Sequence, residues 1–363
     1  MVSPAGAGGV HHYSWMLAGA LEKRGVGVTL AVGDGFERIP IPGPSRTLGL
    51  GVGGQNRSPR AYPADCARVL RSGKAHDVVH IQAPLWSLGD AVALLPALRR
   101  TTNMLSATLH EALPYHRRWY HRAAYRRFYS CPHAVAVHSE GHRRLLEEIG
   151  ARPGVVRVVP FGDHGDALGD PDPALSPRRC LGLADRPLVL FFGLVRPHKG
   201  LHDLIDALRG THEEASLLVA GEPLEPMEPY EQHARSAGVD LLLDREYLRY
   251  LSGPRAAACL ADADALVLPY REGTNSGVLS VAGAHSVPTV VTSVVAPPEY
   301  LALVPGDGVC APGDVAALRV AIGRALDGTL PPPARFPTWS EAAEAHLELW
   351  GHLQPTPQVV GQA

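Results

Sequence analysis

Short apolar runs alternate with longer segments of helical periodicity along most of the chain. In the first half, apolar runs predict buried strands at residues 28–32, 78–82, 104–109, 134–137 and 155–159. Between them, apolar residues recur every three or four positions, which predicts helices at 10–24, 61–71, 88–99, 115–129 and 141–149. Strands that alternate with helices in this way favour an α/β fold with a parallel sheet.

The second half repeats the pattern. Strands are predicted at 188–192, 216–220, 265–268 and 289–292, and helices at 201–209, 254–261, 276–285 and 315–326. Between the halves, residues 163–187 are rich in Asp, Gly and Pro, which is typical of a linker. Proline residues at 331–333 break the chain, and an amphipathic helix over 338–353 begins at a Thr338 or Ser340 cap.

We therefore expect two Rossmann-like domains that face each other across a central cleft, where a ligand would bind at the carboxyl ends of the strands. The expected boundaries are 1–165 for an N-terminal acceptor domain, 166–186 for a linker, 187–330 for a C-terminal nucleotide-sugar domain and 331–363 for a crossover helix and tail. Only three residues precede the glycine-rich 4–9 segment, so the first strand is expected to be truncated, either natively or through a misplaced start.

Composition excludes several classes of protein. A net charge of −2 argues against bulk binding of nucleic acid, and no apolar run is long enough to span a bilayer. The five cysteines are dispersed, which indicates reduced thiols in a cytoplasmic protein, and no secretion signal is apparent at the start. The 18 histidines show no metal-binding spacing, so no metal is expected.

A glycine-rich loop in the second half carries the most specific chemistry. The sequence GLVRPHKG at 193–200 lies between a predicted strand and a predicted helix, and it places Arg196 and Lys199 three residues apart. Two cations beside the N–H groups of a helix start suit a diphosphate. A solvated basic turn is the alternative, and spacing alone does not exclude it.

An ordered set of motifs resembles the retaining GT-B glycosyltransferases of the family 4 type, also called glycosyl transferases group 1. These enzymes move a sugar from a nucleotide-sugar to an acceptor. The motifs are SPAGAGGV at 3–10, TLHE at 108–111, VHSE at 137–140, VVPFG at 158–162, FGLVRPHKG at 192–200, LVAG at 218–221, ADAD at 261–264 and VLPYRE at 267–272. The helix around Trp339 looks like the family's closing element, which crosses back to the N-terminal domain.

The resemblance implies a metal-independent transfer in which Arg196 and Lys199 neutralise the leaving diphosphate. Backbone N–H groups of Ser276, Gly277 and Val278 would assist at a helix start, although Ser276 could equally be an ordinary cap. No cofactor is expected, because the nucleotide-sugar is a substrate.

Four further residues take roles from the resemblance. Glu272 would hold the hydroxyls of the donor sugar or support its anomeric centre, and His110 would contact that sugar and help to set up the reaction. Gly8 and Gly9 would offer backbone donors to phosphate or sugar. The alternatives are a surface carboxylate, a structural histidine and a simple glycine turn.

One position departs from the family pattern. Relatives often carry a second glutamate that binds the nucleotide ribose, and counting back from Pro288 places Val281 there. Valine cannot accept a hydrogen bond from ribose. UDP is therefore favoured only by its frequency in the family.

The predicted helix at 115–129 is basic and aromatic. It carries Trp119, Tyr120, Tyr125 and Phe128 together with Arg117, Arg118, Arg122, Arg126 and Arg127. It could form a peripheral contact with a membrane, bind a phosphorylated acceptor, or be a packed helix whose arginines are solvated.

The leading hypothesis is a cytoplasmic glycosyltransferase in glycan or natural-product biosynthesis. Its acceptor would be lipid-linked, a polysaccharide or a small natural product such as an antibiotic. Two alternatives stay open: a GT-B-fold sugar-nucleotide epimerase, which would need acid and base residues in the cleft, and a catalytically degenerate GT-B protein that binds a partner.

Overall fold

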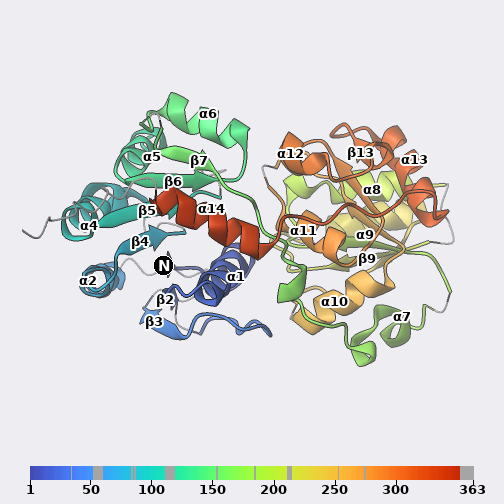
Figure 1. The fold of residues 1–363 in the computed structure, drawn as a ribbon. Helices are drawn as coiled ribbons and strands as arrows, with labels where there is room; N and C mark the ends of the chain where they lie inside the picture. The colour runs from blue at the N-terminus through green and yellow to red at the C-terminus, as the bar shows by residue number, and fades with distance from the viewer. Residues whose placement is uncertain are drawn as a thin grey trace, which may run out of the picture. The chain divides into compact units, whose positions relative to one another are not determined.

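The computed structural model describes residues 1–33, 35–51, 60–82, 85, 87–110, 119–152, 154–183, 185–210, 215–251, 253–273 and 275–351. The chain divides into two units. Unit 1 comprises Met1–Arg38, Pro42–Gly162 and Pro337–Ala363, and unit 2 comprises Ile39–Ile41 and Asp163–Phe336. Each unit is an α/β layer structure built on a parallel sheet (Figure 1).

Unit 1 contains a seven-stranded sheet of order β3-β2-β1-β4-β5-β6-β7. The strands are β1 Val2–Ser3, β2 Thr29–Gly33, β3 Arg46–Leu50, β4 Val78–Ile81, β5 Met104–Thr108, β6 Ala134–Val137 and β7 Val156–Val158. The short β1 lies in the middle of the sheet and pairs with Ala31 on one side and Ile81 on the other.

The helices of unit 1 connect these strands. They are α1 Gly9–Lys23, α2 Tyr62–Gly73, α3 Ser87–Gly89, the π-helix η1 Asp90–Leu94, α4 Leu95–Thr101, α5 His121–Ser130 and α6 Glu140–Ile149. The ends of α6 illustrate how sequence sets the bounds. The Ser139 side chain accepts a bond from His142 N–H at the start, and Gly150 ends the helix with a left-handed backbone.

Unit 2 contains a six-stranded sheet of order β10-β9-β8-β11-β12-β13. The strands are β8 Leu188–Phe192, β9 Ser216–Ala220, β10 Asp240–Leu242, β11 Ala265–Leu268, β12 Thr289–Thr292 and β13 Val309–Cys310. Its main helices are α8 Leu201–Leu208, α9 Glu228–Ala237, α10 Gly253–Asp262, α11 Gly277–Ala284, α12 Pro298–Leu301 and α13 Val315–Leu326. Shorter turns are η2 Gly165–Ala167, η3 Pro173–Leu175, α7 Pro177–Cys180, η4 Pro197–Lys199 and η5 Gly306–Gly308.

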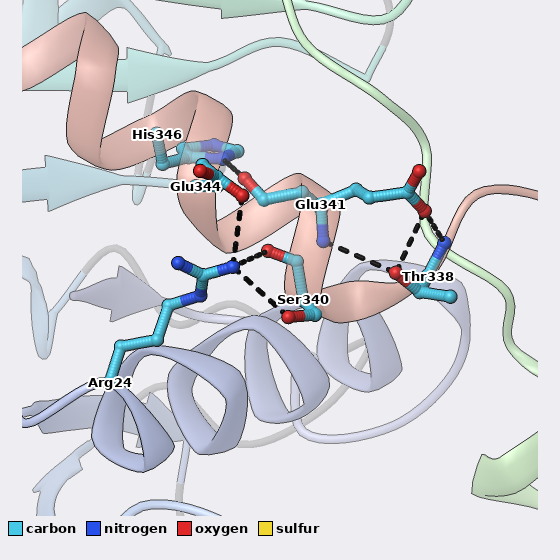
Figure 2. Close-up of polar contacts among 7 residues, drawn as sticks. Arg24, Thr338, Ser340, Glu341, Glu344 and His346 are labelled. Atoms are coloured by element: carbon cyan, nitrogen blue, oxygen red, sulfur yellow. Dashed lines mark hydrogen bonds and ion pairs between the residues drawn. The ribbon is translucent and has the colours of Figure 1, made fainter.

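The last helix, α14 (Trp339–Gly351), returns to unit 1 and packs against α1. Its start is a capping box, in which Thr338 Oγ1 accepts a bond from Glu341 N–H and Glu341 Oε2 accepts one from Thr338 N–H (Figure 2). The guanidinium of Arg24, just beyond α1, donates to Ser340 and Glu344 at 3.0–3.1 Å (Figure 2). The predicted Thr338 cap is thus confirmed.

The predicted α/β architecture is confirmed, and most predicted strands lie within two residues of their observed bounds. Five elements were not predicted from the sequence: the edge strands β3, β10 and β13 and the helices α9 and α12. The predicted helix at 115–129 begins at His121 in the described part, and residues 111–118 lie outside it. Within the described ranges, no helix has the length and apolarity to cross a bilayer.

The segment predicted as a linker packs on unit 2. Ser176 Oγ donates to Asp262 at 2.5 Å, and the guanidinium of Arg178 donates to Asp264 at 2.6 Å. Ser176 and Arg178 therefore attach this segment to unit 2, through bonds to both ends of the α10–β11 connection.

Candidate functional site

The glycine-rich loop after β8 has a backbone that depends on glycine. Gly193 and Gly200 have φ angles of 112° and 72°, in the left-handed region that favours glycine. A Cβ at Gly200 would also clash with the carbonyl oxygen of Pro269. The loop thus lies directly against the end of β11.

Lys199 lies over an aromatic ring at this point. Its Nζ is 3.5 Å from the centre of the Tyr270 ring, and Tyr270 is buried. The Tyr270 hydroxyl lies 3.3 Å from Ser276 Oγ, and its carbonyl accepts a bond from Thr292 Oγ1. Tyr270 is therefore fixed on both sides, and its ring holds the ammonium by a cation–π contact.

The other predicted charges gather around His198. The His198 carbonyl accepts bonds from the N–H groups of Arg271 and Glu272, at 2.8 and 3.5 Å. Burial lowers the pKa of the His198 imidazole, the charges of Lys199 and Arg196 lower it further, and Glu272 opposes them. Arg196, Lys199 and Glu272 thus act on one imidazole, and none of the ion pairs among the described residues includes them.

Arg271 has a different role from its neighbour Glu272. Its guanidinium makes two bonds to the Asp203 carboxylate of α8, at 2.8 and 2.6 Å. This bidentate pair fixes the backbone beside Glu272, whose own side chain is exposed.

The start of α11 lies beside the loop. Gly193 is close to Val278, because a Cβ at Gly193 would be 3.6 Å from a Val278 methyl group. Ser276 is the residue before the helix, but its side chain bonds to Tyr270 and not to the helix backbone. In the described part of the chain, no bond occupies the N–H groups of Gly277 and Val278, which suits an anion.

Sequence reasoning missed three polar groups of unit 2. Asn275 Oδ1, just before α11, is buried and has no hydrogen-bond partner among the described residues. Ser280 Oγ lies 3.2 Å from His164 Nδ1, on the helix face next to Val281. Val281 itself is only 6% exposed and packs in the core. A polar residue in an otherwise apolar helix was the available signal for Ser280.

In unit 1, His110 follows the carboxyl end of β5. Its Nε2 lies 3.1 Å from Gln82 Oε1, and its ring meets the Tyr13 ring edge-on at 4.7 Å. Burial lowers the pKa of His110 to about 3, so the imidazole is neutral at pH 7. Because the Gln82 oxygen only accepts, Nε2 carries the proton and Nδ1 keeps a lone pair. Gln82 follows β4 as His110 follows β5, a signal that the sequence analysis overlooked.

Gly8 and Gly9 begin α1, which also carries Tyr13. Gly8 has φ 79° and ψ −172°, a backbone that requires glycine. A Cβ at Gly9 would meet no atom within 4 Å, so open space lies beside the first turn of α1. No acidic residue occupies that turn.

The basic helix α5 has a mixed surface. Phe128 and Tyr129 are buried in the core, whereas Arg122, Arg126 and Arg127 are exposed. Trp119, just before the helix, is 94% exposed. Arg117 and Arg118 lie outside the described residues. The packed-helix interpretation therefore holds for Phe128 but not for Trp119.

The structure thus places the predicted residues in two groups. Unit 2 holds Arg196, Lys199, Glu272, Ser276, Gly277 and Val278 around one loop and one helix start. Unit 1 holds His110, Gly8 and Gly9, with the arginines of α5 on another element.

Two family models match complementary parts of the chain. The model described as "Glycosyl transferase 4-like domain" matches residues 8–162, and the model described as "Glycosyl transferases group 1" matches residues 186–328. Together they cover every strand of the two sheets except β1.

Curated relatives match more locally. Glycogen synthase of Mycobacterium tuberculosis (strain CDC 1551 / Oshkosh) is 33% identical over 180 residues, which cover 48% of this chain and 41% of that protein. GDP-mannose:glycolipid 4-beta-D-mannosyltransferase of Xanthomonas campestris pv. campestris is 26% identical over 223 residues, which cover 57% of this chain and 58% of that protein. These matches span less than two thirds of the length of either relative.

Solved structures resemble the chain over nearly its full length. HepE of Anabaena, solved in complex with UDP and glucose, has a TM-score of 0.66 at 16% identity and covers 97% of this chain and 96% of its own. This similarity establishes the fold, which is the GT-B fold that the motifs predicted. With both halves matched by their models and the fold shared throughout, the chain belongs to the group 1 glycosyltransferases.

Proposed function

We propose that this protein is a glycosyltransferase that takes a sugar from a nucleotide-sugar and adds it to an acceptor hydroxyl. The observation that carries the proposal is the position of Lys199 over the Tyr270 ring, with Arg196 on the same loop and Glu272 after β11, where its N–H bonds to the His198 carbonyl. Two cations outside any described ion pair would form a receptor for a diphosphate, next to a helix start where Gly277 and Val278 N–H bond to none of the described residues.

The proposed transfer retains the configuration of the sugar and needs no metal. The bond from the anomeric carbon to the diphosphate breaks, and its electron pair leaves with the diphosphate. Arg196 and Lys199 supply the compensating positive charge, which is the role a metal would otherwise play. The acceptor oxygen bonds the same face of the sugar, and its proton passes to the departing phosphate oxygen.

Glu272 and His110 would hold the sugar during this step. An exposed carboxylate at the end of β11 can accept bonds from sugar hydroxyls. A neutral His110, with Nδ1 as an acceptor, can do the same and cannot serve as a general acid near pH 7.

For the nucleotide we propose UDP, with no further cofactor. The support is the similarity to HepE, which was solved with UDP, while the mannosyltransferase relative is named for GDP-mannose. Because Val281 is apolar and buried, and the Ser280 hydroxyl is buried and bonds to Gly277 and His164, we assign ribose binding to Asn275.

We further propose a cytoplasmic location and an acceptor at a membrane surface. Trp119 is 94% exposed, Val92 58% and Leu88 39%. Val92 lies on η1 and Leu88 on α3, which pack against α5, and Trp119 lies just before α5. Arginines of α5 accompany them. Exposed apolar side chains with basic residues suit an anionic bilayer. A lipid-linked acceptor is therefore preferred to a polysaccharide or an antibiotic.

The first experiment is a binding screen on the purified chain. Calorimetry and thermal shift against UDP, GDP, dTDP, ADP and their sugar conjugates are run with a chelator present. A ligand of the native state raises its melting temperature. One nucleotide that binds, and binds more weakly to Lys199→Ala, supports the proposal and names the donor class.

The open alternatives have different outcomes. If no nucleotide binds, the catalytically degenerate binding protein is favoured. If a UDP-sugar is converted without an acceptor, the epimerase is favoured. For the transferase itself, NMR measures the anomeric configuration of the product. A configuration equal to that of the donor sugar supports a retaining transfer. Sedimentation with anionic vesicles, comparing Trp119→Ala with the parent chain, decides the membrane contact.

A further inference from the structure

A basic pocket lies in unit 1 and includes none of the residues of the proposed transfer. Its volume is about 470 Å³, and its walls include Ala91, Arg99, Arg100, Arg127, Ser130 and Cys131. The helices α4 and α5 end where β5 and β6 begin. The arginines at these helix ends therefore lie near the amino ends of the strands, whereas Gln82 and His110 follow the carboxyl ends.

The pocket gathers positive charge without a described counter-charge. Arg99, Arg100 and Arg127 take part in none of the ion pairs between described residues, and the pocket walls include no carboxylate. Arg152 is a fourth cation nearby, because its charge lowers the pKa of Arg99 together with burial. Arg99, Arg127 and Arg152 all act on the Cys131 thiol, so three guanidinium groups surround this residue.

Two of these cations are fixed in place by backbone carbonyls. Arg99 Nη1 donates to the Cys131 carbonyl at 2.6 Å, and Arg152 Nη2 donates to the Pro132 carbonyl at 3.2 Å. Arg100 and Arg127 are exposed, and none of the described side-chain bonds occupies them. The Ser130 hydroxyl donates to the Arg127 carbonyl at 3.0 Å and keeps its lone pairs.

Helix dipoles explain part of this arrangement. Arg99 and Arg100 lie in the last turn of α4, and Arg127 lies in the last turn of α5, where cations are favourable. The dipole does not explain why Arg99 is partly buried beside Arg152, since like charges repel. An anion in the pocket would relieve that repulsion.

The wall of the pocket also includes an irregular helix. Ala91 belongs to η1, a π-helical turn inserted between α3 and α4. Such turns are rare and are often found at functional sites. The π-helix packs against α5, so it brings Ala91 to the same pocket as Arg127.

We propose that this pocket binds a phosphate monoester or diphosphate group, held between Arg99 and the exposed guanidinium groups of Arg100 and Arg127. Guanidinium groups bind phosphate oxygens in pairs. The volume of about 470 Å³ leaves room for an ester group beside the phosphate. The site is independent of the proposed donor loop, and it can exist whether or not the chain transfers sugar.

The test is a calorimetric titration with inorganic pyrophosphate. The full chain carries Arg196→Ala and Lys199→Ala, so that the donor loop cannot contribute. We expect binding in this background and a loss of affinity of at least tenfold on adding Arg100→Gln and Arg127→Gln. The matched control is Arg122→Gln, which removes an exposed arginine of the same helix outside the pocket and should change affinity less than twofold. Circular dichroism checks that each variant folds.

Vesicles then identify the source of the phosphate. Phosphatidylcholine vesicles contain either phosphatidic acid, with a monoester headgroup, or phosphatidylserine at equal charge. Stronger sedimentation with phosphatidic acid, abolished by Arg100→Gln and Arg127→Gln, supports a lipid-borne ligand. Pyrophosphate binding with equal sedimentation on both lipids supports a free phosphate ester.

Other results overturn the proposal. No binding in the donor-loop background means that pyrophosphate recognises only the donor loop. An equal loss of pyrophosphate affinity with Arg122→Gln means that binding depends on the general positive charge of the surface and not on the pocket.

Discussion

The ammonium of Lys199 lies 3.5 Å from the centre of the Tyr270 ring, at the point where the glycine-rich loop meets the end of β11. A lysine ammonium on a flexible stem is normally free to turn toward solvent. Here a buried ring holds it beside Arg196 and the start of α11. The position is therefore prepared before any ligand binds, which lowers the entropic cost of binding a diphosphate.

Removing either loop cation should abolish most transfer. We expect Lys199→Ala and Arg196→Ala each to lower kcat by about 10²–10³-fold, the usual effect of losing one donor to a developing negative charge. Arg245→Ala, an exposed arginine elsewhere in unit 2, serves as the control and should leave turnover unchanged. Steady-state kinetics with the donor found in the screen makes the measurement. Full activity in both loop variants would contradict the donor-loop assignment.

Substitution of Tyr270 separates the ring from its hydroxyl. Tyr270→Leu removes the surface beneath Lys199 and should weaken nucleotide binding by about 0.5–1 kcal/mol, the size of an exposed cation–π contact. Tyr270→Phe keeps the ring, loses the contact to Ser276 Oγ, and should bind nearly as well as the parent. Calorimetry with the nucleotide distinguishes them. Equal losses in both variants would show that the hydroxyl, and not the ring, positions the site.

Gly9 tests whether a ligand approaches the start of α1. Alanine at this position has space and suits a helix, so Gly9→Ala should leave the melting temperature unchanged or raise it. Activity should nevertheless fall if a substrate contacts the backbone there. Gly8→Ala is the matched comparison, because a φ of 79° strains alanine and should cost about 1–2 kcal/mol of stability. Full activity in Gly9→Ala would show that no substrate contacts this backbone and that Gly9 serves only the turn.

Whether a strand can be predicted from the sequence depends on whether neighbouring or distant residues define it. Buried strands such as β8 and β11 are continuous apolar runs, so residues 188–192 and 265–268 were predicted at their observed bounds. The edge strand β3 reads RTLGL and is mostly exposed, so its pattern is weak and only pairing with β2 defines it. Local patterns identify buried elements, whereas edges depend on partners distant in sequence.

The candidate site residues also divide into those that a local motif indicates and those that depend on distant contacts. Arg196 and Lys199 lie on one short motif, and the resemblance, rather than their spacing, singles them out as candidates. The roles of Tyr270 and Gln82 depend on contacts to Lys199 and His110, which lie 71 and 28 residues away. The unpaired Asn275 oxygen and the pocket around Cys131 have no motif at all, because each is created by the packing of separate elements.

His110 should affect turnover more than binding. We expect His110→Ala to lower kcat by about 10–100-fold with little change in nucleotide affinity, because the groups that we propose to bind the nucleotide lie in unit 2. Gln82→Leu should produce a smaller loss, since it releases the ring nitrogen that Gln82 orients. His142→Ala, on α6, is the control. A loss of affinity without a change in kcat would remove His110 from the reaction.

Two buried histidines, His346 on α14 and His80 on β4, should make the protein less stable in acid. His346 Nε2 lies 3.1 Å from Thr108 Oγ1, His80 lies between Ser106 and Thr108, and Trp350 Nε1 donates to Ser106 Oγ. Burial lowers the pKa of His346 to about 4 and holds that of His80 well below its usual range. These side chains are neutral in the folded state near pH 7.

The direction of the pH effect on the free energy of unfolding follows from which state binds protons. Between pH 6.5 and about 4, the unfolded chain binds protons at these histidines and the folded chain does not. The free energy of unfolding should therefore fall as the pH falls through this window, by about 3 kcal/mol for His346 alone at 1.36 kcal/mol per pH unit. Urea denaturation at several pH values measures it. His346→Gln, which can still bond to Thr108 but does not titrate, should be less stable at pH 7 and lose less on acidification. His121→Gln, outside the cluster, should keep the parent slope, and an unchanged slope in His346→Gln would exclude His346 as a source of the acid sensitivity.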